Sequence, residues 1–127
     1  MMSKHPIIIE QGLQALNQGR FYSAHEYFED AWRDTPDESR EFFRALLHIS
    51  GGFYRLTQDR PTAAKKFFSR AQHWLGGFPS PHLGFETDRI RTDVERLIAL
   101  IDAGKPSQDI LEQDSIYIPW ESQEQST

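Results

Sequence analysis

The chain has 127 residues, a size typical of one domain built around one hydrophobic core. It contains no cysteine, which excludes disulfides, thiolate metal ligands and cysteine nucleophiles and fits a reducing, cytoplasmic compartment. Its net charge of -5 argues against a nucleic acid partner, because the chain lacks the excess of Lys and Arg that binds phosphate backbones.

Five segments show the 3.6-residue spacing of apolar side chains that predicts amphipathic helices. The first begins near Ile8 and ends at the turn 17–19, the second spans about 21–33, and the third spans about 38–57. The fourth runs from Pro61 to Gly76, and the fifth runs from the loop 78–85 to the turn 104–106. The apolar run at residues 7–9 is too short for a signal peptide. No segment approaches the roughly 20 apolar residues that span a bilayer, so we expect no membrane association.

The third predicted helix has the widest apolar face, with Phe42, Leu46, Ile49 and Phe53 in register. A face of this width is typical of an element with neighbours on several sides. The pair at 51–52 is Gly-Gly, and each glycine costs roughly 1 kcal/mol relative to alanine inside a helix. The pair therefore predicts either close approach of another helix or a bend.

A shift of forty residues superimposes two stretches of the chain at the turn into a helix. The pairs are Leu16 and Leu56, Gln18 and Gln58, Arg20 and Arg60, Ala24 and Ala64, Phe28 and Phe68, and Ala31 and Ala71. The spacing of small and aromatic residues here also resembles the second half of a tetratricopeptide unit: Gly19, Phe21, Ala24, Phe28 and Ala31. Chance spacing of two amphipathic helices is the alternative. We predict an all-α fold, a compact bundle of about five helices built from two helical hairpins plus a closing helix and a C-terminal strap.

The C-terminal region alternates between apolar and polar stretches. Apolar residues at 110–111 and 116–120 are flanked by the polar segments 112–114 and 121–127. We expect residues 1–105 to form a single helical domain and residues 106–127 to form a strap or tail. The residues Ile116, Tyr117, Ile118 and Trp120 are expected to pack on a helical surface, either of this chain or of another.

Residues 17–33 read Asn-Gln-Gly-Arg-Phe-Tyr-Ser-Ala-His-Glu-Tyr-Phe-Glu-Asp-Ala-Trp-Arg. This segment resembles the signature of the domain-of-unknown-function family three hundred and nine: Asn-x-Gly-x-aromatic, then Ala-His-Glu-x-x-Glu-x-x-Trp. The likeness covers about residues 13–75. It departs at 45–48, where Ala-Leu-Leu-His replaces a Gly-Leu-Ile-Gln-like segment, so His48 stands where the family usually has an amide. At 63–64, Ala-Ala replaces a Gly-Ala-like turn. The resemblance implies an all-helical bundle inside the cell, and the family has no assigned activity.

The predicted second helix carries a stripe of chemically active side chains. His25, Glu29 and Trp32 occur at i, i+4 and i+7 beside the apolar face, where burial shifts pKa values or a divalent metal binds. Glu26 lies about a quarter turn further out and is expected to be solvated. On the third helix, Arg44, His48 and Arg55 form a polar stripe that either faces the second helix or is a solvated surface.

These residues admit three interpretations. In the first, His25 and Glu29 form a structural hydrogen-bond network around Trp32. In the second, they bind a small ligand or transfer a proton, with His48 or Arg44 holding an anionic group. In the third, His25, Glu29 and His48 bind a divalent metal, which needs a third ligand from a second helix.

The sequence assigns no function directly, and whether the chain is an enzyme stays open. We favour a small helical binding or interaction module, with a protein partner or self-association rather than a small molecule as its ligand. An enzyme or metal-binding protein is the alternative. No complete catalytic set is visible, because phosphate loops, metalloprotease motifs and nucleophile elbows are all missing from the sequence.

Overall fold

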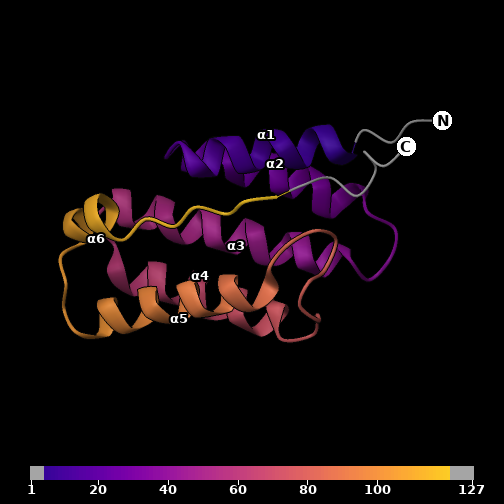
Figure 1. Cartoon of the computed structure of the whole chain (residues 1–127). Coiled ribbons are helices and arrows are strands. Elements are labelled where there is room, and N and C mark those ends of the chain that lie inside the picture. Colours follow the sequence, from indigo (N-terminus) through magenta and orange to yellow (C-terminus); the bar gives the residue numbers. More distant parts are fainter. Residues whose placement is uncertain (1–4, 121–127) are drawn as a thin grey trace.

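A computed structural model describes residues 5–120, and within this range it contains six α-helices and no strand (Figure 1). The helices are α1 (His5–Asn17), α2 (Phe21–Asp34), α3 (Arg40–Thr57), α4 (Pro61–Leu75), α5 (Thr87–Asp102) and α6 (Ser107–Gln113). The predicted all-α fold is confirmed, but the helices number six rather than about five. The additional helix, α6, has 7 residues, too few for a helical period to stand out in the sequence.

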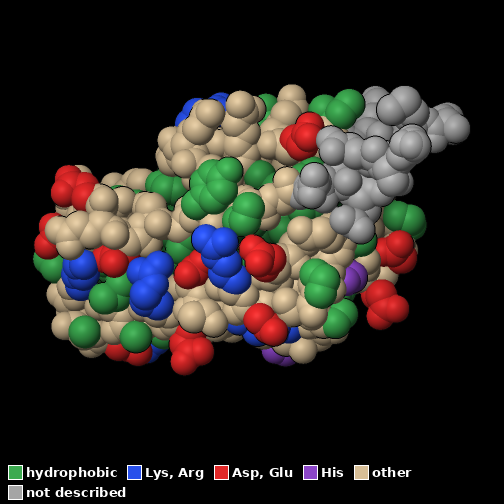
Figure 2. All heavy atoms as spheres, in the orientation of Figure 1, with side chains coloured by type: hydrophobic (Ala, Val, Ile, Leu, Met, Phe, Trp, Pro, Cys, Tyr) green, Lys and Arg blue, Asp and Glu red, His purple; other side chains and the backbone are tan. Residues whose placement is uncertain are grey.

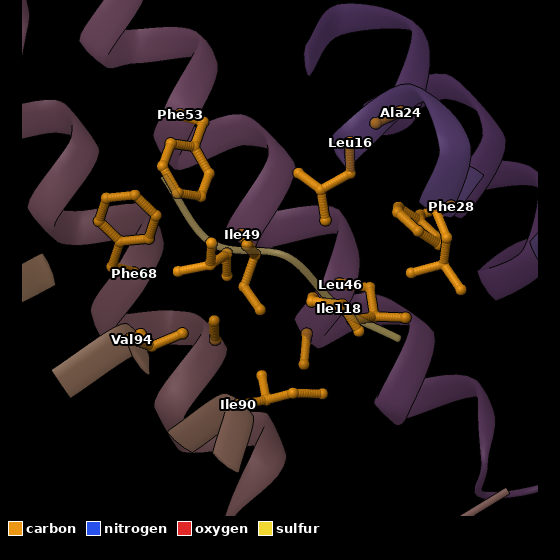
Figure 3. Packing of buried hydrophobic residues seen from close by; sticks show 14 of the residues in the cluster. Leu16, Ala24, Phe28, Leu46, Ile49, Phe53, Phe68, Ile90, Val94 and Ile118 are labelled. Atoms are coloured by element: carbon orange, nitrogen blue, oxygen red, sulfur yellow. The ribbon is translucent and has the colours of Figure 1, made fainter. Parts of the chain in front are cut away.

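Consecutive helices pack side by side from α1 to α5, and α6 packs against α3 and α5. Helix α3 has the central place predicted for it, between α2 and α4. Its apolar residues Phe42, Leu46, Ile49 and Phe53 are at most 1% exposed, and Figure 3 shows three of them facing side chains of other helices. Within residues 5–120, no helix is long and apolar enough to cross a membrane.

The glycines of α1 and α3 mark two equivalent close contacts between helices. A Cβ atom on Gly12 would lie 2.8 Å from the ring of Phe28, and a Cβ atom on Gly52 would lie 2.5 Å from the ring of Phe68. The two pairs are forty residues apart, and Phe28 and Phe68 are one of the pairs of the predicted repeat. The turns that follow α1 and α3 are also equivalent, because in each a backbone N–H donates to the carbonyl five residues earlier: Arg20 to Ala15, and Arg60 to Arg55. Close approach of α4, one of the two explanations considered, therefore accounts for the glycine pair in α3.

Residues 114–120, called the docked segment below, run in extended form along α3 between α1 and α5 (Figure 1). Ile116 and Ile118 are 7% and 2% exposed and belong to the core, and Figure 3 shows Ile118 in the same cluster as Leu46. Trp120 is half-buried against the same core. The expected packing on a helical surface is thus confirmed for these three residues and wrong for Tyr117, which is 62% exposed. In an extended chain alternate side chains point to opposite sides, so Tyr117 turns away when both isoleucines turn inward.

Candidate functional site

The side of α3 opposite its buried face lies between α2 and α4. Arg44, His48 and Arg55 project there, because α-helical geometry places them roughly half a turn from Leu46 and Phe53. Side chains from the two neighbouring helices join them. We call the whole set the basic-aromatic face: Tyr22, His25 and Trp32 of α2, Arg44, His48 and Arg55 of α3, and Phe67, Arg70 and Trp74 of α4.

Arg44 is held between two tryptophans from different helices. Its guanidinium carbon lies 4.9 Å from the ring centroid of Trp32 and 4.5 Å from that of Trp74. Its Nη1 atom lies 3.2 Å from Oε2 of Glu41, one turn earlier on α3. Cation–π attraction to two rings restricts the position of the guanidinium, so its donors are partly oriented before any ligand arrives.

His48 occupies the middle of the face and is neutral at pH 7. Its ring lies 5.8 Å from that of Phe67. Burial lowers its pKa from 6.5 to about 4, helped by the positive charges of Arg70 and Arg44 and by His25. Its Nδ1 atom is buried and has no hydrogen-bond partner within the described part of the chain. The lowered pKa makes this histidine a weak proton acceptor at neutral pH.

A second arginine lies at the other end of the face. The guanidinium carbon of Arg55 is 5.6 Å from the ring of Phe67 and 5.9 Å from that of Tyr54. Its Nη1 atom donates to Oε1 of Gln58 at 2.8 Å. Tyr22 of α2 reaches across to Tyr54, with ring centroids 5.4 Å apart. Aromatic rings therefore flank arginines at both ends of the face.

The face concentrates positive charge in an acidic chain. Arg44 pairs with Glu41, whereas Arg55 and Arg70 have no acidic partner within 4 Å among residues 5–120. On the side crossed by the docked segment, by contrast, Lys and Arg side chains alternate with Asp and Glu side chains (Figure 2). Two unneutralised arginines beside a third stacked one make this surface attractive to carboxylates or other anions.

The residues predicted on α2 have separate surroundings. His25 is half-buried, stacks on Tyr22 with centroids 6.3 Å apart, and lies close enough to His48 to affect its pKa. Glu29 instead accepts a hydrogen bond from Nη2 of Arg33 at 2.8 Å. Glu26 is exposed, as expected for a solvated carboxylate.

The structure does not gather the ligands proposed for a metal. Within residues 5–120, no three His, Asp or Glu side chains lie close enough together to hold a metal ion, so His25, Glu29 and His48 do not form a ligand set. The polar stripe of Arg44, His48 and Arg55 is half-buried between two helices rather than a fully solvated surface.

Sequence reasoning missed the contribution of α4. By apolar spacing alone, Phe67 and Trp74 belong to the apolar face of this helix, and Arg70 is expected to be a solvated cation. Their spacing of i, i+3 and i+7 puts the three on one stripe, which is the signal that could have found them. That stripe faces α3 at the edge of the core, so its aromatic residues contact arginines as well as apolar neighbours.

Comparison with known proteins shows that part of the chain is similar to a known family. Residues 9–67 match the family model described as "Domain of unknown function (DUF309)". The resemblance expected from residues 17–33 is confirmed. In this DUF309 segment, the signature residues His25 and Trp32 line the basic-aromatic face, and Ala24 is fully buried.

One similar protein is an "Uncharacterized protein" of Aquifex aeolicus (strain VF5). It is 22% identical to this chain over 108 residues, which make up 84% of this chain and 32% of that protein. This chain thus spans about a third of the length of its relative. Neither comparison assigns an activity, and the function of the chain is unassigned.

Proposed function

We propose that this chain is a helical binding module whose basic-aromatic face binds an acidic segment of a partner protein. The observation that carries the proposal is the stack of Trp32, Arg44 and Trp74, contributed by three helices. Arg44 keeps 31% of its side chain exposed, so a ligand can reach it. Its contact with Glu41 is a carboxylate contact within the chain, which is the chemistry that an acidic partner would supply.

The size of the face favours a peptide segment over a single small anion. Arg44 and Arg55 are eleven positions apart on α3, which corresponds to about 16 Å along the helix axis. An extended peptide rises about 3.3 Å per residue, so about five residues cover that distance. Arg70 on α4 adds a third cation to the face.

Two buried nitrogen atoms support a role beyond packing. Nε1 of Trp32 and Nδ1 of His48 have no hydrogen-bond partner within the described residues. Each unsatisfied buried polar atom costs about 1–3 kcal/mol. Departures of this kind from a well-satisfied fold concentrate at functional sites.

The same contacts argue against catalysis by these residues. Glu29 accepts a hydrogen bond from Arg33, and within the described residues no hydrogen bond joins it to His25, so this carboxylate does not orient the imidazole. A histidine with a pKa near 4, as in His48, is a poor general base at neutral pH. We therefore favour binding over the alternative of an enzyme that uses His25, Glu29 and His48.

The test is binding of a fluorescein-labelled hexa-aspartate peptide, measured by anisotropy at low ionic strength, with hexa-asparagine as the neutral control. We expect saturable binding of the acidic peptide alone, weakened at least tenfold in a variant that combines Arg55→Gln and Arg70→Gln. The matched control combines Lys65→Gln and Arg89→Gln, which also removes two positive charges; these side chains are 43% and 55% exposed and pair with Asp102 and Glu86, away from the face. It should leave binding within about twofold, the loss expected from a change in net charge alone.

Two results would overturn the proposal. One is equal binding of the acidic and neutral peptides, or an equal loss in the variant that combines Lys65→Gln and Arg89→Gln, since either would make the attraction nonspecific. The other is displacement of the peptide by inorganic phosphate at concentrations far below those of the peptide, which would assign the face to small anions.

A further inference from the structure

The docked segment is held at three points in the manner of a bound peptide. At its start, Oδ2 of Asp114 accepts from Nζ of Lys105 at 2.6 Å, and Oδ1 accepts from Nη1 of Arg96 at 3.3 Å. At its end, Nε1 of Trp120 donates to the carbonyl of Leu83 at 2.7 Å. The Trp120 ring also stacks on the ring of Phe85, with centroids 5.5 Å apart.

Between these ends, a side chain of α1 pairs with the peptide backbone. The N–H of Ile118 donates to Oδ1 of Asn17 at 2.9 Å, and Nδ2 of Asn17 donates to the carbonyl of Ile118 at 3.1 Å. The Asn17 amide thus satisfies both backbone groups of one residue that lies 101 positions away. A contact to backbone groups does not depend on the side chain at that position, which is the way receptors hold extended peptides.

Specificity comes from alternate side chains. Ile116 and Ile118 point into the core, and Tyr117 between them points out. The surface therefore recognises an acidic residue, aliphatic residues two and four positions after it, and an aromatic residue six positions after it. Every second position is free to vary.

Open hollows border the docked segment on both sides. One, of about 480 Å³, lies against α1 and is lined by Leu13, Gln14 and Asn17 together with Tyr117 and Ile118. Another, of about 410 Å³, is lined by Gly84, Glu86, Pro119 and Trp120. The edges of the segment are therefore accessible, unlike those of a strand sealed within a core.

We propose that the surface under residues 114–120 is a peptide-binding groove, that the docked segment is its intramolecular ligand, and that an extended segment of another protein with the same pattern displaces it. This groove lies on the opposite side of α3 from the basic-aromatic face and takes a different ligand. In this proposal the groove belongs to the helical domain, residues 1–105, and its intramolecular ligand belongs to the C-terminal strap, residues 106–127. Tethering gives the strap an effective concentration in the millimolar range, so a partner competes only when it binds tightly or when the strap is loosened.

The experiment uses the full chain with the strap loosened and the groove intact. Ile116→Ser combined with Ile118→Ser removes both buried side chains of the docked segment and changes no groove residue. The probe is a labelled synthetic peptide with the sequence of residues 114–120, followed by anisotropy. In the control peptide, the tyrosine and the isoleucine that follows it exchange places, so that a tyrosine occupies an inward-facing position.

We expect the loosened chain to bind the probe at least tenfold more tightly than the wild-type chain, in which the tethered segment competes. Asn17→Ala in the loosened chain should weaken binding at least tenfold. Equal binding of both peptides, or equal binding by the loosened and wild-type chains, would overturn the proposal.

A second measurement on the wild-type chain covers the case in which the loosened variant does not fold. Hydrogen exchange of the Ile118 amide should be at least tenfold faster than that of the slowest α3 amides, since the segment must leave while the helices stay folded. Exchange of Ile118 only together with the α3 amides would mean that the groove never opens, and would equally overturn the proposal.

Discussion

Substituting Gly52 by alanine tests the close contact between α3 and α4. The added Cβ would lie 2.5 Å from Cε1 of Phe68, a ring that is fully buried and cannot move aside. Overpacking costs about 1–3 kcal/mol, and a contact of 2.5 Å is closer than Cβ atoms approach in real proteins, so this site lies in the upper part of that range, at about 2–3 kcal/mol. The gain in helix propensity returns about 1 kcal/mol. We therefore expect a net loss of about 1–2 kcal/mol in the free energy of unfolding.

Two neighbouring glycines provide matched comparisons. In Gly51→Ala, the Cβ would lie 3.0 Å from Phe67, which is only half-buried and can shift, so we expect a change of less than about 0.5 kcal/mol. In Gly12→Ala, the Cβ would lie 2.8 Å from the fully buried Phe28, so this variant should behave like Gly52→Ala.

The assay is urea unfolding followed by circular dichroism, with the slope of the transition checked for constancy. The expected order of stability is wild type and Gly51→Ala above Gly12→Ala and Gly52→Ala. A Gly52→Ala variant as stable as the wild type, or a Gly51→Ala variant that loses as much as Gly52→Ala, would refute the explanation of these glycines by ring contacts.

Three further predictions follow from the same structure. Because the pKa of His48 is lower in the folded chain than in the unfolded chain, stability present above pH 6.5 should be lost as the pH falls toward 4. The loss is about 1–2 kcal/mol once solvent screening of the half-buried ring is allowed for, and His48→Gln should remove it in unfolding curves measured across that range. Arg44→Lys keeps the charge but loses the stacked plane, so hexa-aspartate should bind about fivefold more weakly in the anisotropy assay; unchanged affinity would deny the two tryptophans a role. Deleting residues 106–127 removes Ile110, Ile116 and Ile118 from the core and should lower the melting temperature by more than about 10 °C in calorimetry, whereas an unchanged melting temperature would show that the strap adds nothing.

The fold was largely predictable because its helices follow local rules. Apolar spacing located α1 to α5, and the forty-residue repeat paired Phe28 with Phe68, whose rings contact Gly12 and Gly52 in the same way. Helix α6 was missed since 7 residues give too short a period. Tyr117 was misplaced because the sequence shows that a stretch is apolar but not which of its side chains face inward.

The candidate site was predictable in its residues but not in its arrangement. The stripes carrying His25, Trp32, Arg44 and His48 were visible as helical spacings. Their meeting depends on how α2 and α4 flank α3, which no local pattern specifies. The role of Trp74 therefore emerged only in three dimensions, since one residue serves both the core edge and the Arg44 stack.

The proposed acidic ligand can be tested most directly by titrating the wild-type chain with hexa-aspartate while recording backbone amide and histidine ring signals by nuclear magnetic resonance. Burial is the main cause of the low pKa of His48, and the positive charges of Arg70 and Arg44 lower it further. The binding proposal predicts shift changes confined to α2, α3 and α4 around Arg44, together with a rise in the pKa of His48 as bound carboxylates offset those two charges. Shift changes confined to α1, α5 and the docked segment, or a His48 pKa that stays near 4 at saturation, would contradict it.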